Sequence, residues 1–540
     1  MIKKFIIAVL AASALVAGAL GLVACNVPKP ETHKPPKTEL NYRLADDGTH
    51  YCVTGLVNAT DTNVIIPSTH DDKPVTEIAD NAFKYKSSIT TVILPEGITS
   101  IGESAFEYCT ALIGISLPDG LLYIGESAFE ECASLTSIDL PDSLTEIGKG
   151  AFNKCYALRQ VNIPKGLSEI SENAFSFCTS LTSITIPSNI TSIGYCAFIW
   201  CYKLVEIYNL SSVTVIAGSY GDDGILHYAG AYALNVYDSE SAESKLTTDK
   251  DGYVFYDYNG TIYLMGYAGD ETQLTLPHLN GKNYEIYNYA FYRNANISSI
   301  TISENSLVPL IGNYAFFDCY ALKNFYIEGT VYKIGEHAFQ DCRKLEETPL
   351  TDSIGIIGDC AFYSCSSLTS FTVPANVTVI GKSVINACDK LESVTVAKGN
   401  SVYYSKNNCI IKTNGKEVIA GCKTSVIPYG ILSIGDYAFG SCRIKSVEIP
   451  ETVTNIGDWA FGFTDLTEIV IPASVKTIGE GAFFSCSSLQ SAEFELTENW
   501  TVTDPFGVKS ITKEELTDYA TAAEYLRSTY RRHRWERAIG

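Results

Sequence analysis

The chain repeats one short sequence unit, and this repeat limits the possible folds more than any other feature. The dipeptide Ala-Phe recurs at 23-residue steps from 82–83, and the step has shortened to 22 by 482–483. With the degenerate copy Val384-Ile385, the chain holds fourteen copies. Self-similarity at a period of about 20–50 residues is typical of solenoids, in which each copy buries its apolar side chains only against its neighbours.

The copy at residues 135–155 (LTSIDLPDSLTEIGKGAFNKC) shows what each part of the unit predicts. Leu135, Ile138 and Leu140 have the alternation of a strand with one buried face. Pro141 ends that strand because proline has no N–H to donate to a ladder. A second short extended piece precedes Ala-Phe, which we expect in a tight helical or turn segment. Gly102, Gly125, Gly148 and Gly194 follow Ile at equivalent places, which indicates a preferred turn. Copies stacked in register would form a parallel sheet.

The pattern LxxIxIPxxVTxIGxxAFxxC covers about residues 40–495 and resembles the BspA-type leucine-rich repeat of bacterial surface proteins. The resemblance implies an α/β solenoid, a leucine-rich repeat right-handed superhelix with a parallel β-sheet on one face and short helical turns on the other. To this the sequence adds β-hairpin inserts and a C-terminal helical cap. The resemblance also implies adhesion to host extracellular-matrix proteins or to other cells.

Breaks in the period divide the chain into nine segments. The hairpins are predicted from turns at Asp46-Asp47-Gly48, Asn259-Gly260 and Asn414-Gly415, and residues 218–247 are expected to be loop. A capping box at Thr512–Glu515 predicts the C-terminal helix. The segments are a signal peptide (1–24), a Pro/Lys-rich tether (25–38), an N-terminal β-hairpin cap (39–74), a first repeat block (75–210), an insert with a hairpin (211–286), a second block (287–396), a hairpin insert (397–424), a third block (425–494) and a C-terminal cap with a helix (495–540).

The N-terminus reads as a targeting segment. Lys3 and Lys4 precede an apolar run that ends at Leu22-Val23-Ala24-Cys25. This resembles a bacterial lipoprotein signal with its lipobox, which implies removal of residues 1–24 and lipidation of Cys25. The alternatives are an ordinary secretory peptide or a transmembrane helix, for which the run is barely long enough. We therefore expect a membrane-anchored lipoprotein at the bacterial cell surface, held to the membrane by its lipid anchor only.

Most of the seventeen cysteines stand at one position of the repeat. We interpret them as buried thiols that act as small hydrophobes. Neighbouring coils would bring them within disulfide range, so bridges stay an open alternative. Around Asn414-Gly415 the pairing would place Cys409 opposite Ala420, with Cys422 one diagonal away. The column comprises Cys109, Cys132, Cys155, Cys178, Cys201, Cys319, Cys342, Cys365, Cys388, Cys442 and Cys486.

The sequence offers no catalytic motif and no phosphate-binding loop. Close Cys pairs with His, as in zinc sites, are also missing, so we expect no metal, no cofactor and no enzyme activity. The formal net charge of −22 argues against binding to nucleic acid or to anionic lipid, because both are negatively charged and are bound by clusters of Lys and Arg. The arginines that follow residue 526 are interpreted as part of a terminal cap rather than a docking patch.

Binding by a solenoid usually uses its sheet face. We therefore predict that a protein or glycan ligand on host or neighbouring cells contacts the variable middle residues of the Ile-x-Ile stretches. The alternatives are an envelope scaffold without a host ligand and, less favoured, a carbohydrate-active enzyme with its site in 211–286. The candidate binding residues are Ser116, Asp139, Asn162, Thr185, Tyr208, Thr301, Tyr326, Thr372, Thr395 and Glu448.

Overall fold

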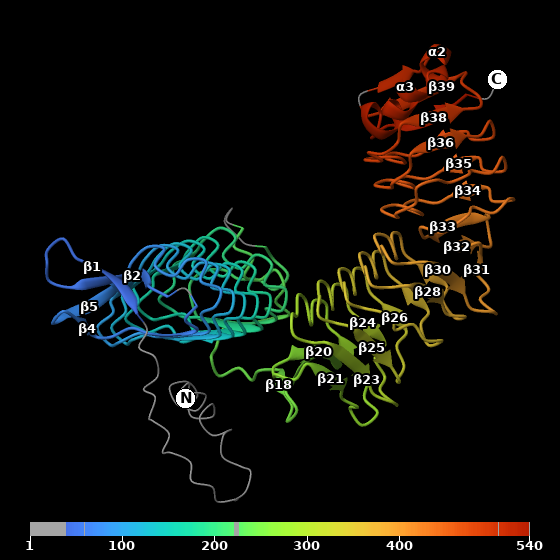
Figure 1. Ribbon diagram of the computed structural model, residues 1–540. Helices are drawn as coiled ribbons and strands as arrows, with labels where there is room; N and C mark the ends of the chain where they lie inside the picture. Colours follow the sequence, from blue (N-terminus) through green and yellow to red (C-terminus); the bar gives the residue numbers. More distant parts are fainter. Residues whose placement is uncertain (1–38, 59, 221–225, 506, 539–540) are drawn as a thin grey trace, which may run out of the picture. The chain divides into compact units, whose positions relative to one another are not determined.

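The computed structural model describes residues 39–58, 60–220, 226–505 and 507–538, and Cys25 with the rest of the predicted signal and tether lies outside them. The chain forms two compact units, residues 1–243 and 244–540, which we describe separately (Figure 1). Both are stacks of short coils. Most coils contribute one strand from their Ile-x-Ile stretch and one from their Thr-x-Ile stretch, so each unit has two rows of strands rather than the single sheet face that we predicted.

Unit 1 begins with the predicted hairpin, in which β1 (Leu40–Leu44) pairs antiparallel with β2 (Tyr51–Leu56). Its Ile-x-Ile row consists of β3 (Asn63–Ile65), β6 (Thr91–Ile93), β8 (Gly114–Ser116), β10 (Ser137–Ile138), β12 (Gln160–Val161), β14 (Ser183–Ile186), β16 (Glu206–Asn209) and β17 (Asn235–Tyr237). Its Thr-x-Ile row consists of β5 (Lys73–Ile78), β7 (Ser100–Ile101), β9 (Tyr123–Ile124), β11 (Glu146–Ile147), β13 (Glu169–Ile170) and β15 (Ser192–Ile193), with β4 (Thr69–His70) pairing to β5.

We had expected the segment 218–247 to be loop, but part of it forms a strand. Its strand β17 pairs in parallel with β16, so it adds a further coil to unit 1. The buried Ala229 and Ala233 and the partly buried Val236 supply the apolar positions of that coil, but they stand outside the 23-residue period. Sequence spacing alone therefore hid this coil.

Unit 2 contains the other two hairpins. β18 (Leu246–Thr248), β19 (Tyr253–Tyr258) and β20 (Thr261–Tyr267) form the first, and β31 (Tyr403–Lys406), β32 (Cys409–Lys412) and β33 (Glu417–Gly421) form the second. Its Ile-x-Ile row is β21 (Gln273–Leu276), β23 (Ser299–Ile302), β25 (Asn324–Ile327), β28 (Ser370–Val373), β30 (Ser393–Val396), β36 (Glu468–Ile471) and β38 (Ser491–Phe494). Its Thr-x-Ile row is β22 (Glu285–Ile286), β24 (Leu310–Ile311), β26 (Lys333–Ile334), β27 (Ile356–Ile357), β29 (Val379–Ile380), β34 (Ser433–Ile434), β35 (Asn455–Ile456) and β37 (Thr477–Ile478).

Each hairpin starts a block of coils. The last strand of each pairs in parallel with the first Thr-x-Ile strand that follows it: β2 with β5, β20 with β22, and β33 with β34. All three hairpins also carry a register shift of one residue near this junction. The buried apolar residues form three clusters, one to each block. Each hairpin therefore starts one core, and the third hairpin also packs into the core before it through Ile410 and Ala420.

Residues one coil apart face each other in these ladders, so like side chains stack. Ile184 pairs with Ile207, and the rings of Phe83 and Phe106 lie parallel with centroids 5.1 Å apart. The same stacking continues from Phe106 to Phe198 with centroids 5.2 to 5.6 Å apart. Offset aromatic stacking adds to the free energy gained from burying these rings. The Ala-Phe repeat therefore builds the centre of the core.

The Ala-Phe segments are hydrogen-bonded turns and not the short helical turns that we predicted. In the first coil, Asn81 and Tyr85 on either side of the dipeptide have φ of 58° and 62°, and most later coils repeat this pair of left-handed residues. A left-handed residue ends a right-handed helical turn. The N–H groups of Asn81, Phe83 and Tyr85 instead donate to carbonyls of the next coil. The turns thus form a third ladder between coils.

The glycine after Ile serves close packing and not a positive φ. A Cβ at Gly125 would lie 2.6 Å from the backbone nitrogen of Glu103 in the preceding coil. Gly148 and Gly194 approach the preceding coil in the same way. The small residue is needed because the backbones of successive coils nearly touch here.

The C-terminal segment contains the predicted helix but combines it with strands, so a wholly helical cap is not confirmed. β39 (Trp500–Asp504), β40 (Gly507–Ser510) and β41 (Arg534–Arg537) join the sheet of β37 through antiparallel pairing. Three short helical stretches lie between them: α2 (Lys513–Thr517), α3 (Tyr519–Glu524) and η1 (Tyr525–Thr529). The capping box between Thr512 and Glu515 is present with both of its hydrogen bonds. The buried Trp500 and Trp535 pack on Phe494 of the last coil.

The arginines of this segment contact the last coils. Arg534 pairs with Asp458 at 3.2 Å, and Arg537 donates to the carbonyls of Val475 and Ala473. The guanidinium of Arg531 lies 5.3 Å from the ring centroid of Phe484. These contacts agree with a role in closing the stack.

Cys409 lies opposite Gly421 and not opposite Ala420 as predicted. The reason is the register shift between Ile410 and Ile411, which a turn-based count from Asn414-Gly415 cannot foresee. Both Cys409 and Cys422 are free buried thiols, as are the cysteines of the repeat column.

Candidate functional site

The predicted binding residues lie on the Ile-x-Ile rows, divided between the two units. Most stand in a strand, while Asp139 and Asn162 directly follow one and Glu448 lies in a coil without an assigned strand. Unit 1 carries Ser116, Asp139, Asn162, Thr185 and Tyr208, and unit 2 carries Thr301, Tyr326, Thr372, Thr395 and Glu448.

Two of the unit 1 residues have structural contacts. The side chain of Asn162 accepts from the N–H of Leu140 and donates to its carbonyl, at 2.8 and 2.7 Å. These two side-chain hydrogen bonds link the backbone of Leu140 to the next coil just beyond the paired strands β10 and β12. The ring of Tyr208 lies 5.1 Å from that of Tyr237, the next residue in its row. At these two positions the side chains on the face of unit 1 contact neighbouring coils of the same unit.

The row of unit 2 is interrupted between β25 and β28. The N–H groups of Asn324 and Glu328 donate to the preceding coil, and alternation along a strand places the N–H of Tyr326 in the same ladder. One coil later the equivalent residue is Pro349, which has no N–H. Residues 345–350 accordingly form no strand, and no sheet joins β25 to β28.

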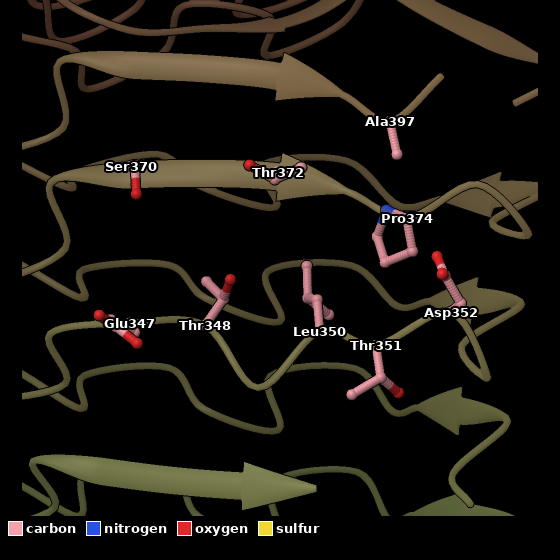
Figure 2. Close-up of a pocket in the computed structure, with 9 residues that line it drawn as sticks. All are labelled: Glu347, Thr348, Leu350, Thr351, Asp352, Ser370, Thr372, Pro374 and Ala397. Atoms are coloured by element: carbon pink, nitrogen blue, oxygen red, sulfur yellow. The ribbon is translucent and has the colours of Figure 1, made fainter. Parts of the chain in front are cut away.

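This interruption opens a recess of about 390 Å³ in the strand face. Figure 2 shows the chain dipping between Thr348 and Leu350, with Thr372 and Pro374 of the next coil above it. Polar lining comes from hydroxyls and from the carboxylates of Glu347 and Asp352, and apolar lining comes chiefly from Leu350, Pro374 and Ala397. Thr372 donates to or accepts from Thr395 at 2.9 Å, so the wall is ordered by a hydroxyl pair. Pro349 was the sequence signal for this recess, but the residues that line it were not predicted apart from Thr372.

Rows of aromatic side chains on the turns are a second feature that sequence analysis missed. Tyr85 stacks on Tyr108 with centroids 5.0 Å apart, and Phe177 lies 4.1 Å from Trp200. All four occupy the left-handed position after Ala-Phe, and Tyr85 and Trp200 are exposed. Their spacing of 23 residues is visible in the sequence.

The cysteine column has a hydrogen-bonding role that the interpretation as small hydrophobes missed. The thiol of Cys155 donates to the carbonyl of Phe129 in the preceding coil at 3.2 Å, and Cys132 and Cys178 repeat this contact. Thr464, which replaces cysteine in one coil, donates to Phe461 with its hydroxyl. Burial raises the pKa of Cys109 and of Cys388 to about 12. These thiols are therefore protonated at neutral pH and unsuited to nucleophilic chemistry.

Within the described residues, none of the helices has the length and apolar character needed to cross a bilayer.

The stacked coils, their in-register parallel strands and their Leu, Ile and Phe core define a leucine-rich repeat solenoid. The chain belongs to the BspA type leucine-rich repeat family, whose model of six repeat copies matches residues 76–205, 284–414 and 417–515.

Crystal structures similar to the chain include three bacterial proteins. The T. pallidum leucine-rich repeat protein is 32% identical over 32% of this chain and 90% of its own, with a TM-score of 0.27. A leucine-rich cell surface protein of Faecalibacterium prausnitzii is 20% identical over 87% of this chain and 96% of its own, with a TM-score of 0.27. The pneumococcal vaccine antigen PcpA is 20% identical over 78% and 92%, also at 0.27. No curated protein matches the chain.

Proposed function

We propose that this protein is a lipid-anchored bacterial surface protein that mediates adhesion by binding a protein on host matrix or on other cells. The observation that carries the proposal is the recess at Pro349, a concave site on the strand face of unit 2. Binding sites are typically concave, with an apolar lining and a few polar groups that fix orientation. The recess is concave but more polar than such sites usually are, since hydroxyls and two carboxylates surround Leu350.

The chemistry of the recess selects the kind of side chain that it would take. Glu347 and Asp352 supply negative charge, and Leu350 offers an apolar surface between them. A lysine or arginine fits both, because it has an aliphatic stem and a charged end. The net charge of −22 would also steer a basic partner toward the protein. We therefore expect the ligand to be a basic protein segment.

The test is to fill the recess. The full chain and its variants are assayed for saturable binding to a panel of immobilised extracellular-matrix proteins and to intact bacterial cells. Thr372→Trp should abolish or strongly weaken binding because the indole occupies the recess. Thr301→Trp is the matched control, since Thr301 holds the same strand position in β23 away from the recess. Saturable binding that Thr372→Trp leaves unchanged would exclude the recess as the site.

The lipid anchor is a separate part of the proposal, supported by the sequence Leu22-Val23-Ala24-Cys25. Cys25→Ala should release the protein from the membrane fraction and abolish incorporation of labelled fatty acid. If the alternative of an envelope scaffold is correct, crosslinking in intact cells will recover envelope proteins alone and the matrix panel will give no saturable binding. Absence of enzyme activity is a further part of the proposal.

A glycan ligand is the second candidate, and the exposed aromatic rows of unit 1 favour it. Aromatic faces such as those of Tyr85 and Trp200 can stack on the apolar faces of sugar rings. Binding to an immobilised glycan panel that Trp200→Ala abolishes, while Thr372→Trp leaves it intact, would favour this candidate over the recess.

A further inference from the structure

Three side chains with metal-binding atoms converge at the start of unit 1. Cys52 in β2 lies opposite Glu77 in the parallel strand β5, and His50 precedes β2 on the same side as Cys52. Residues two apart in an extended chain point to the same face. The Sγ of Cys52 lies 2.9 Å from Oε2 of Glu77, and Nε2 of His50 lies 3.4 Å from Oε1. All three ligand atoms are within 4.8 Å of one another.

The contacts of His50 on its other side fix the state of its ring. The hydroxyl of Thr49 donates to Oδ1 of Asp47 at 2.8 Å and lies 2.9 Å from Nδ1 of His50. Because the hydroxyl proton is already used at Asp47, Nδ1 of the imidazole must be the donor to Thr49. In this tautomer the lone pair of Nε2 lies on the side of the Glu77 carboxylate, 3.4 Å from Oε1. A histidine that binds a metal has this arrangement, with its remote N–H held by an oxygen.

Cys52 differs from the thiols of the repeat column. It is buried, with 2% of its surface exposed, but its hydrogen bond goes to a carboxylate and not to a backbone carbonyl. Two acceptor-rich groups, the Glu77 carboxylate and the Nε2 of His50, thus meet beside a thiol. A cation placed among them would satisfy all three. Arg43, opposite Cys52 in β1, lies near enough to interact with the thiolate and would offset part of its charge.

We propose that His50, Cys52 and Glu77 bind one divalent cation of the zinc class. The mixed set of nitrogen, sulfur and oxygen suits zinc, whereas calcium and magnesium require oxygen ligands. Three protein ligands leave a fourth tetrahedral position open, and His50 and Glu77 are partly exposed there. The ion would tie the hairpin strand β2 to the first coil strand β5 and so fasten the start of the solenoid.

Cobalt provides a direct test, because Co²⁺ bound to a thiolate in tetrahedral geometry absorbs in the near-ultraviolet and visible regions. The full chain, freed of metal with a chelator, is titrated with Co²⁺ and then with Zn²⁺. We expect one equivalent of Co²⁺ to produce both absorptions and Zn²⁺ to displace it. Cys52→Ser and His50→Gln should remove the signal. His70→Gln is the matched control, since His70 lies in the neighbouring strand β4 outside the cluster.

Two further variants protect the test against simple misfolding. Glu77→Gln keeps the shape of the side chain and one oxygen that can accept from the Cys52 thiol, so the variant should fold, yet Zn²⁺ should raise the Tm of the wild type and not that of the variant. Thr49→Val leaves all three ligands in place but removes the hydroxyl that joins Nδ1 of His50 to Asp47, and it should weaken Zn²⁺ binding by about 10–100-fold. Failure of the wild type to bind one equivalent, or binding that Cys52→Ser and His50→Gln leave unchanged, would overturn the proposal.

Discussion

At the scale of single residues, the repeat is specified by hydrogen bonds as much as by apolar burial. The carbonyl of Phe129 accepts from the N–H of Cys132 in its own coil and from the thiol of Cys155 in the next. Leaving such a buried acceptor short of a partner costs free energy, so the thiol is more than a small apolar side chain. Thr464, the one Thr in the column, does not reproduce this contact, because its hydroxyl donates to Phe461 of its own coil. The sequence predicts that the column cysteines are small and buried. Their role as hydrogen-bond donors depends on the direction of the Phe carbonyl in the preceding coil, which the sequence does not show.

The raised thiol pKa values make stability depend on alkaline pH. Burial raises the pKa of Cys109 to about 12, so above about pH 8.5 the unfolded chain loses this proton while the folded chain keeps it. The free energy of unfolding should therefore fall with rising pH, by about 1.4 kcal/mol per pH unit for each such thiol. Cys109→Ala should reduce the slope by that amount between pH 8.5 and 10, measured by urea unfolding. Leu112→Ala, equally buried but not titratable, should lower stability without altering the slope.

The left-handed turn residues predict a stabilising substitution. Ala387 has a φ of 58°, a conformation that costs an L-residue about 1–2 kcal/mol but costs glycine nothing. Ala387→Gly should raise the free energy of unfolding by about 0.5–1 kcal/mol once the greater freedom of glycine in the unfolded chain is subtracted. Ala473 is exposed and is not left-handed. Ala473→Gly should therefore lower stability by a similar amount, and equal effects of the two would contradict the turn geometry.

At the scale of elements, the sequence predicted where the hairpins and the C-terminal helix lie, but it did not predict that the strands form two rows. Asp-Gly and Asn-Gly turns located all three hairpins, and Thr512–Glu515 located the first helix. The bulge in each hairpin, the second row of strands and the left-handed turns depend on how coils meet, and no residue type alone encodes that. Pro349 could have been recognised as a break, since it occupies a strand position where its neighbours carry Tyr326 and Thr372.

Replacing Pro349 tests the origin of the recess. Pro349→Thr restores one ladder donor, worth about 0.5–1.5 kcal/mol, and frees the unfolded chain at a cost of about 0.4–1 kcal/mol. The two nearly cancel, so stability should change by less than about 1 kcal/mol. The strand should instead re-form, which would slow hydrogen exchange at Ile327 and close the recess. Thr395→Pro is the converse control in β30 and should destabilise by about 1–3 kcal/mol, because it removes a backbone donor from the ladder. Unchanged exchange at Ile327 in Pro349→Thr would show that the proline is not the cause.

At the scale of the whole molecule, the division into two units leads to a prediction about cleavage. The apolar cluster of unit 1 ends at Ala233, and the first cluster of unit 2 begins at Tyr253. A protease site inserted between Glu243 and Ser244 should yield two fragments that each keep their β-sheet circular dichroism and melt cooperatively. Loss of the strand signal in either fragment would show that the two cores depend on each other.

The solenoid architecture of the whole molecule was the feature most easily predicted from the sequence, because many copies of a repeat remain recognisable when single copies vary. One degenerate copy such as Val384-Ile385 does not hide thirteen others. The candidate site was the feature least easily predicted from the sequence, because the recess arises where one coil departs from the repeat. Its lining comes from three successive coils, and only Thr372 among them was selected in advance.

The three hairpins also have a consequence for how the chain acquires its structure. A hairpin closes between residues adjacent in sequence, so it forms without waiting for distant segments. Each block therefore has a local nucleus at its N-terminal end, and coils can add to it one at a time in the order in which the chain emerges from a ribosome or an export channel. If one block folds slowly, the blocks before it will already be folded. Folding intermediates should therefore have their boundary between folded and unfolded chain at the start of a block.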